Sequence, residues 1–320
     1  MHHIKDSLEN NQIYIYFISI IIAIILGLSS VEIGQLLESW ITLLLAILMF
    51  SMFTQIPFTK LKQALNHTKF IGVLLLTNFV AIPILVFILI QLFQIETKPL
   101  ELGIYLVLLT PCIDYVIVFT HLGKGDASLI TIATPILLIV QMLLLPIYLT
   151  LMLDYPLQEL IVFEPFVTSF VVIIVVPLCL AILLQYFSKW QPLILRTQQL
   201  TSWLPVPMMS LVLIAVISSQ INKVLASAEI VFTVIPIYVC FLLCAPILAL
   251  LTGKLFGLSI IEQRTLTFST STRNSLVVLP LALALPSEIA LITSTVIITQ
   301  TIIELIGELV YIRVFPKVIN

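Results

Sequence analysis

The sequence predicts an all-α integral membrane protein with ten transmembrane helices, arranged as an inverted repeat of five plus five. Composition is the first observation: 61% of the 320 residues are hydrophobic and 9% are charged, against roughly 25% charged residues in soluble domains. Ten long apolar windows are the second, because about 20 apolar residues cross the hydrocarbon core. The third is that helices 4 and 9, in matching places of the two halves, are both broken, which points to a binding site near the membrane midplane.

The same composition excludes several other classes of protein. The 14 basic residues do not outnumber the 16 acidic ones, so the chain has no basic surplus for binding nucleic acid. Four scattered cysteines do not form a disulfide framework, and no window alternates as the strands of a membrane barrel do. No zinc-ligand spacing, phosphate-binding loop, dinucleotide-binding glycine pattern or nucleophile elbow is present. We therefore expect no metal, no cofactor and no enzymatic activity, with the lipid bilayer as a partner.

The apolar windows are separated by loops too short to hold a soluble domain, so we treat residues 1–320 as a single membrane domain. The first window is too long for a signal peptide and lacks a small-residue cleavage site, which predicts a retained helix. The expected helices lie at about residues 13–29, 37–54, 69–93, 102–121, 127–153, 161–187, 199–219, 228–253, 265–285 and 288–314.

The positions of Lys and Arg orient these helices. With ten spans, eleven basic residues fall on one side of the membrane, and only Lys98 and Lys223 fall on the other. The eleven are Lys5, Lys60, Lys62, Lys69, Lys124, Lys189, Arg196, Lys254, Arg264, Arg313 and Lys317. Because cytoplasmic loops are enriched in Lys and Arg, the sequence predicts a multi-pass protein of the plasma membrane with both termini in the cytoplasm.

Two repeats are expected, at about residues 13–153 and 161–316, and five is an odd number, so they would insert with opposite orientation. Polar and helix-breaking residues interrupt helix 4 at residues 109–114 and helix 9 at residues 269–275. Paired interruptions of this kind are typical of the binding sites of secondary transporters. The alternative is that Pro111 merely kinks helix 4 and that the hydroxyl groups bond to their own backbone.

Four charged residues fall at membrane depth: Asp114, Arg273, Glu304 and Glu308. Each needs a partner or a water-filled cavity, because a charge at the bilayer centre costs at least ~2.5–3.5 kcal/mol. Asp114 and Arg273 belong to the two interrupted helices, so they are candidates for a pair that a substrate or a proton opens. The alternative is a permanent salt bridge that fixes the crossing of the two helices.

Arg273 is also a candidate anion-binding group, since guanidinium pairs with carboxylates and oxyanions beside the free amides of a half-helix. Glu304 and Glu308 lie one turn apart on helix 10, with Gln300 a turn earlier, and this polar stripe is able to relay protons. Glu304 is the stronger candidate for a proton-binding carboxylate, because Glu308 lies close enough to Arg313 for a place at the inner interface.

The run from Cys112 to Asp126 resembles the helix-4 signature of arsenite efflux permeases, in which a cysteine opens a similar run that closes on Leu-Ala-Lys-Gly-Asp. Asn274 and the stretch from Val277 to Pro286 resemble the second half of helix 9 in the same superfamily, the bile acid:sodium symporters. The resemblance implies a ten-helix carrier with a panel domain and a core domain, whose unwound segments cross at the substrate site. It also implies a thiol for trivalent arsenic at Cys112, since soft thiolates favour soft elements, although one cysteine makes only part of a three-thiolate site.

The second crossing segment departs from that family. Residues 273–276 contain no carboxylate, whereas the arsenite permeases carry a glutamate there and the sodium-coupled branch holds sodium with a glutamate and a glutamine. This difference argues against Na⁺ and favours H⁺ as the coupling ion, bound by Asp114 or Glu304. Arg273 favours an anion or an oxyanion as the substrate.

Together these observations predict a secondary transporter, with proton-driven efflux of arsenite or another oxyanion as the leading hypothesis. The predicted substrate-binding residues are Cys112, Asp114, Arg273, Asn274 and Ser275; the coupling residues are Asp114, Glu304 and Glu308; the cavity-lining residues are Thr110, Pro111, Thr272, Asn78 and Gln300. Ordinary interhelical hydrogen bonds explain Asn78 equally well.

Other functions stay open at this point. Uptake of a small organic anion such as a carboxylate, coupled to Na⁺ or H⁺, is the main alternative. An intramembrane enzyme acting on lipid through Asp114 or Glu304 would need an acidic metal-binding pair or a nucleophile with its base, which the sequence lacks. A channel is disfavoured by the paired interruptions.

Overall fold

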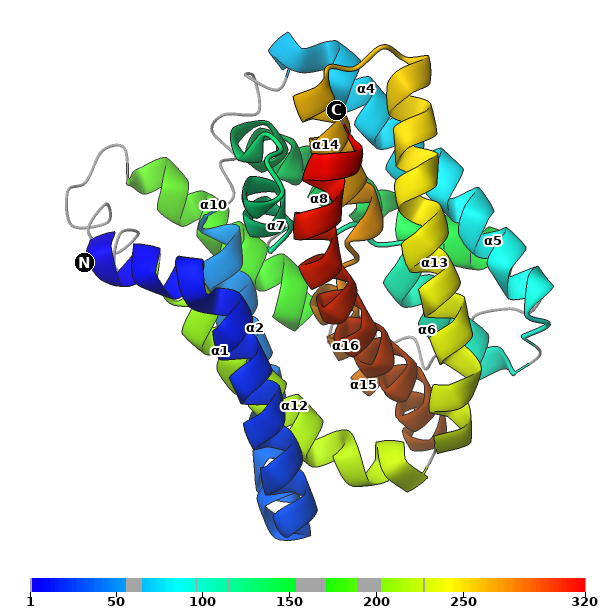
Figure 1. The fold of residues 1–320 in the computed structure, drawn as a ribbon. Coiled ribbons are helices and arrows are strands. Elements are labelled where there is room, and N and C mark those ends of the chain that lie inside the picture. Colours follow the sequence, from blue (N-terminus) through cyan, green and yellow to red (C-terminus); the bar gives the residue numbers. More distant parts are fainter. Residues whose placement is uncertain are drawn as a thin grey trace. The chain divides into compact units, whose positions relative to one another are not determined.

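A computed structural model describes residues 2–55, 65–95, 97–113, 115–153, 168, 171–188, 203–226 and 228–319 (Figure 1). Within these ranges every regular element is a helix and no strand is present, which confirms the predicted all-α class for this part of the chain. The helices form two compact units, each built from both halves of the sequence. They are Met1–Thr59 with Glu164–Ala228, and Lys60–Phe163 with Glu229–Asn320.

The first unit is held together by close helix contacts. Its elements are α1 (His2–Ser29), α2 (Val31–Phe53), the π-helical turn η5 (Val171–Val175), α10 (Val176–Phe187) and α12 (Pro205–Ala226). α12 packs along both α1 and α2. A Cβ added to Gly27 would lie 2.5 Å from the Ser218 carbonyl oxygen, so glycine permits this approach. Ser218 Oγ and Asn222 Nδ2 then donate to the carbonyl oxygens of Ala23 and Gly27, as is common between membrane helices.

The second unit contains the interrupted helices. Its elements are η2 (Leu65–His67), α4 (Thr68–Leu76), the π-helical turn η3 (Thr77–Ala81), α5 (Ile82–Leu92), α6 (Lys98–Leu108), α7 (Val116–Leu122), α8 (Ala127–Met152), α13 (Ala228–Leu255), α14 (Ile260–Ser271), α15 (Ser275–Leu283) and α16 (Ser287–Val318). α16 packs along α6 and α15, while α7 lies against α8 and α14.

In the part of the chain that the structure describes, six helices are long and apolar enough to cross a membrane, and all six overlap predicted windows. They are Val31–Phe53, Thr68–Leu92, Ala127–Met152, Pro205–Asn222, Ala228–Leu255 and Ser287–Val318. Two further apolar helices, Tyr14–Ser29 and Val176–Phe187, are shorter within the described residues. The multi-pass membrane character of the chain follows from these spans.

The remaining two predicted windows are split, as the sequence indicates. Helix 4 becomes α6 and α7, and helix 9 becomes α14 and α15. The break in helix 9 is shorter than predicted, because residues 269–271 still belong to α14 and only residues 272–274 leave the helix. Thr270 Oγ1 donates to the Leu266 carbonyl oxygen of its own helix at 2.7 Å, so its hydroxyl group does not break the helix.

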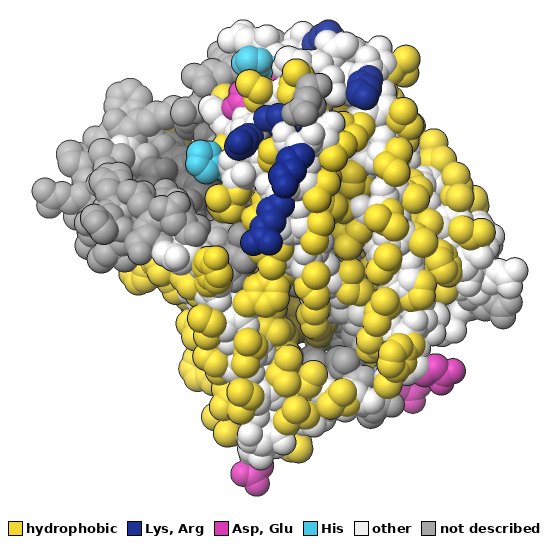
Figure 2. All heavy atoms as spheres, viewed as in Figure 1, with side chains coloured by type: hydrophobic (Ala, Val, Ile, Leu, Met, Phe, Trp, Pro, Cys, Tyr) yellow, Lys and Arg dark blue, Asp and Glu magenta, His cyan; other side chains and the backbone are white. Residues whose placement is uncertain are grey.

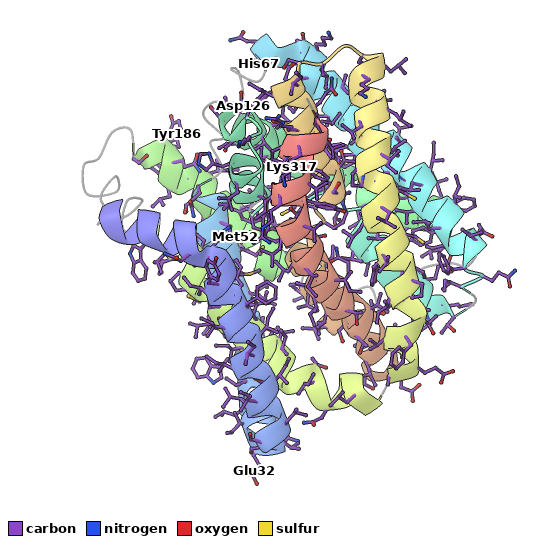
Figure 3. The ribbon with its side chains drawn as sticks, in the orientation of Figure 1. Glu32, Met52, His67, Asp126, Tyr186 and Lys317 are labelled. Carbon is purple, nitrogen blue, oxygen red and sulfur yellow. The ribbon has the colours of Figure 1, made fainter. Side chains whose placement is uncertain are left out.

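One end of the second unit collects basic residues that the sequence assigns to one side of the membrane. Arg264, at the start of α14, donates to the carbonyl oxygens of Lys124 and Ile319. Figure 3 labels Asp126 and Lys317 at this end, and Figure 2 shows Lys and Arg side chains gathered there, above a surface rich in hydrophobic side chains. The grouping agrees with the predicted topology, and the cytoplasmic assignment of this end stays a prediction.

The π-helical turn η3 positions a polar residue in the core. It directly precedes α5, whose second residue, Pro83, has no N–H and would clash with the Phe79 carbonyl in a regular helix. The wider turn accommodates the proline, and the Tyr148 hydroxyl donates to the Phe79 carbonyl oxygen instead. Asn78 lies within this turn with no exposed surface. Its amide is therefore available only to groups inside the unit.

Candidate functional site

The two interrupted helices meet at their breaks. Pro111, between α6 and α7, and Arg273, between α14 and α15, form an isolated antiparallel bridge. Two backbone hydrogen bonds join the segments: Cys112 N donates to Thr272 O at 3.1 Å, and Asn274 N donates to Thr110 O at 2.8 Å. Each break thus satisfies backbone groups that the other leaves without helical partners.

This meeting point brings four half-helix ends together. α6 and α14 end there, at Leu108 and Ser271, whereas α7 and α15 begin there, at Val116 and Ser275. A helix end carries about half an elementary charge, positive at the N-terminus and negative at the C-terminus, from N–H and C=O groups without helical partners. The site therefore has a negative side, made by the ends of α6 and α14, and a positive side, made by the starts of α7 and α15.

The Arg273 guanidinium occupies the negative side. Among the described residues, its acceptors are four protein oxygens: Leu108 O at 3.3 Å from Nη1, and Asn78 Oδ1, Ser269 O and Thr270 O at 2.9, 3.0 and 2.5 Å from Nη2. The Phe241 ring of α13 lies beside the group, with its centroid 5.6 Å from Arg273 Cζ. The side chain has no exposed surface, and its donors bond to oxygens of α6, α14 and the π turn η3.

Glu304 of α16 contacts both breaks. Its Oε2 accepts hydrogen bonds from the backbone N of Arg273 at 2.8 Å and from Gln300 Nε2. Its Oε1 lies 2.7 Å from the Tyr115 hydroxyl oxygen, which in turn lies 2.8 Å from the Arg273 carbonyl oxygen. A hydroxyl group has one proton, so Tyr115 cannot donate to both oxygens. When the Glu304 carboxyl is protonated, it donates to Tyr115, and Tyr115 donates to Arg273 O.

Glu308 repeats this arrangement one turn later on α16. The Thr272 hydroxyl oxygen lies 2.7 Å from Glu308 Oε1 and 2.6 Å from the Phe268 carbonyl oxygen, and its single proton can serve only one of them. Glu308 Oε2 has no hydrogen-bond partner among the described residues. The side chain is fully buried and shares the inward face of α16 with Glu304, and its place at the inner interface stays a prediction.

Most of the predicted site residues come together at the bridge. Cys112, Arg273, Asn274 and Ser275 lie in or beside the breaks and are at most 1% exposed. Asp114 lies outside the described residues, so its pairing with Arg273 stays a prediction. The five cavity-lining candidates divide into Thr110, Pro111 and Thr272, which belong to the breaks, and Asn78 and Gln300, which contact Arg273 and Glu304.

Buried polar atoms without partners gather around the break in helix 9. Within the described ranges, Ser271 Oγ, Asn274 Nδ2 and Ser275 Oγ have no hydrogen-bond partner. Each such group costs about 1–3 kcal/mol when it is left unsatisfied. Asn274 and Ser275 lie at the start of α15, where the backbone amides favour negative charge, whereas Ser271 is the last residue of α14. These donors are available to a small polar or anionic molecule.

Sequence patterns predict no role for Tyr115 or for the carbonyl oxygens around Arg273. A usable signal existed for Tyr115, since it is a hydroxyl-bearing residue at the end of the helix-4 interruption. The carbonyl oxygens of Leu108, Ser269 and Thr270 have no such signal, because every residue carries one and only the fold decides which of them meet a cation.

The Lys124-Gly125-Asp126 end of the helix-4 run forms a helix junction. Lys124 has φ +58°, in the left-handed region, and Asp126 Oδ1 accepts from Leu129 N at 2.9 Å to cap α8. Asp126 N donates to Thr265 Oγ1 at 2.7 Å, and a Cβ on Gly125 would lie 3.0 Å from that oxygen. This part of the run therefore shapes the backbone between α7 and α8, away from Cys112.

Comparison with known proteins gives a family. The model of the Sodium Bile acid symporter family matches residues 42–228, which is more than half of the chain. This range includes the break between α6 and α7 and ends where α13 begins. No match was found among curated proteins.

Proposed function

Because the chain belongs to the sodium bile acid symporter family, we propose that it is a secondary active transporter of a small anion, coupled to protons bound by Glu304 and Glu308. The family and the apolar helices together make it a multi-pass membrane transport protein. With this function goes the topology expected from the sequence: ten helices in an inverted repeat, in the plasma membrane, with both termini in the cytoplasm. Such repeats place their substrate at broken helices near the membrane midplane.

Proton coupling is carried by one observation, the two hydroxyl groups that are each shared between a glutamate and a backbone carbonyl. Tyr115 is shared by Glu304 and Arg273 O, and Thr272 is shared by Glu308 and Phe268 O. A protonated carboxyl supplies the missing donor in each case. An ionised carboxylate takes the hydroxyl proton and leaves the buried carbonyl without it, so each hydroxyl group changes its acceptor when the carboxyl group gains or loses a proton.

Proton binding acts directly on the break in helix 9. Thr272 and Arg273 are two of the three residues between α14 and α15, and both bond to the glutamates of α16. A substrate held by Asn274 and Ser275 would be attached to the same short peptide. Protons and substrate then change each other's affinity by an equal factor, which is the requirement for coupling.

The substrate belongs on the positive side of the site, because the negative side is filled by Arg273. The starts of α7 and α15 and the donors of Asn274 and Ser275 fit an oxyanion or a carboxylate. Cys112 is buried beside the bridge, and its soft sulfur supports arsenite as the substrate of an efflux permease. The family description supports the second candidate, a small organic anion of the carboxylate type.

Transport by purified protein in proteoliposomes tests the proposal. We expect an imposed pH gradient to drive saturable movement of arsenite or of a radiolabelled carboxylate, and Glu304→Gln and Glu308→Gln to abolish the effect of the gradient. Cys112→Ser should lower arsenite flux about tenfold or more and spare carboxylate flux, with Cys240→Ser on α13 as the control. Flux that does not saturate indicates a channel, and saturable flux indifferent to pH contradicts proton coupling.

A further inference from the structure

We infer that the Arg273 guanidinium is a built-in coupling cation, held where α6 and α14 end, in the position that a free Na⁺ would take in a sodium-coupled carrier. The inference rests on the proposed transport function and on the same meeting of broken helices. It does not depend on protons at the glutamates of α16, so the two proposals can fail separately.

The surroundings of the guanidinium have the chemistry of a cation site. Its four acceptors are three backbone carbonyl oxygens and one amide oxygen, from the ends of α6 and α14 and from the π turn η3. Neutral oxygens of this kind are the ligands that hard cations take in proteins. The Phe241 ring closes another side, and a ring face attracts a cation.

The charge of the position also matches a monovalent cation. Each C-terminal helix end carries about −0.5 elementary charge, so the ends of α6 and α14 together present about −1. Transporters with broken helices commonly coordinate Na⁺ or H⁺ with such C-terminal ends, while the N-terminal ends face the anionic substrate. One guanidinium neutralises this pair of ends without any ion from solution.

A covalently attached charge gives this site a different behaviour from that of an exchangeable ion. Guanidinium stays charged under all physiological conditions. The Arg273 side chain is fully buried and covalently attached, so a cation from solution does not replace it. The position is therefore filled whether or not Na⁺ is present. A member of a family named for sodium symport would on this basis need no Na⁺ at the crossing of its broken helices.

Arg273→Ala should turn the position into a vacant cation site. The variant keeps the carbonyl oxygens of Leu108, Ser269 and Thr270 and the amide of Asn78, and it removes the guanidinium that donates to them. Na⁺ alone is the probe, so the experiment needs no knowledge of the substrate. Thermal unfolding of the full chain in lipid nanodiscs is measured in NaCl and in choline chloride of equal ionic strength, together with binding of radiolabelled Na⁺.

For the wild type we expect equal unfolding midpoints in the two salts and no saturable Na⁺ binding. For Arg273→Ala we expect saturable Na⁺ binding and a midpoint about 2 °C or more higher in NaCl, because a ligand that binds only the folded state stabilises it. Arg273→Lys retains a cation and should behave as the wild type. Arg264→Ala removes another carbonyl-binding arginine of α14, far from the break, and should gain no response to Na⁺.

Two outcomes overturn the inference. One is saturable Na⁺ binding, or stabilisation by Na⁺, in the wild type itself. The other is indifference to Na⁺ in Arg273→Ala. If this variant is not recovered folded in either salt, the same measurements are made on Arg273→Gln, whose side chain is neutral and longer than that of alanine. A Na⁺ response in the variant together with transport that ignores pH would refute proton coupling and leave the built-in cation standing.

Discussion

Replacement of Glu304 by glutamine and by alanine separates a proton-binding carboxyl from a fixed negative charge. Glutamine has the shape of a protonated glutamate: its carbonyl oxygen can accept from the Arg273 backbone N–H and from Gln300, as Glu304 Oε2 does. Its NH₂ group can donate to Tyr115, and the Tyr115 hydroxyl then donates to the Arg273 carbonyl oxygen. Every hydrogen bond of the group is retained in Glu304→Gln.

Alanine removes those acceptors. It leaves the Arg273 N–H and the Gln300 amide buried without them, and each unsatisfied donor costs about 1–3 kcal/mol. We therefore expect the free energy of unfolding to fall by about 2–6 kcal/mol in Glu304→Ala and by less than about 1 kcal/mol in Glu304→Gln. Glu288→Gln, an exposed position on the same helix, is the control and should change nothing.

The assays are thermal unfolding in detergent and two transport measurements in proteoliposomes. Glu304→Gln should still exchange substrate for substrate across the membrane, and it should lose accumulation driven by a pH gradient. If Glu304→Gln is as unstable as Glu304→Ala, the structure requires an ionised carboxylate beside Arg273. That result would refute the protonated carboxyl that we place beside the Tyr115 hydroxyl, and it would favour a permanent ion pair.

Two further predictions concern the packing around the site. In Gly123→Ala the new Cβ would lie 2.0 Å from the Phe268 ring, so the unfolding midpoint should fall by the equivalent of about 1–3 kcal/mol. Gly72→Ala is the control: its Cβ would have no atom within 4 Å, and the midpoint should stay unchanged or rise. An equal loss of stability in both variants would contradict the contact with Phe268. Asp126→Ala removes the N-cap of α8 and should lower the free energy of unfolding by about 1 kcal/mol, as measured by thermal unfolding. Asp126→Asn keeps the cap and should be as stable as the wild type. An alanine variant as stable as the wild type would show that the cap is not formed.

The positions of the two breaks follow from the sequence, because polar residues and a proline interrupt otherwise apolar windows. The polar stripe on α16 is predictable as well, because residues four apart on a helix are neighbours. Gln300 and Glu304, one turn apart, are in contact in the structure. The way in which the breaks join is not predictable, since backbone hydrogen bonds between residues 110–112 and 272–274 involve groups that every residue carries. Only the folded backbone sets that pairing.

Arg273 shows the limit of reasoning from residue type. A guanidinium beside a half-helix predicts an anion site, and the residue does lie at the start of α15. The guanidinium is also attracted to the helix ends on the other side of the break, where four oxygens converge, one of them from Asn78, which is 195 positions away in sequence. The choice between them depends on the direction of the side chain, which the sequence does not encode locally. The alternative for the hydroxyl groups is partly right as well, because the Thr272 hydroxyl oxygen lies 2.6 Å from the Phe268 carbonyl oxygen of the preceding helix as well as 2.7 Å from Glu308 Oε1.

The π-helical turn at residues 77–81 changes the helix locally and leaves its outer face in place. A π turn holds one residue more than an α-helical turn, so it takes up the extra residue without rotating the helix that follows. Deletion of a single residue there would restore a regular helix, and Ile84 and Ile88, which face outward at 55% and 54% exposure, would stay on the outer face. The extra residue widens the helix where Asn78 Oδ1 accepts from the Arg273 guanidinium. Homologous chains that lack this residue would therefore keep the lipid-facing surface of the helix and differ only in the turn beside the cation.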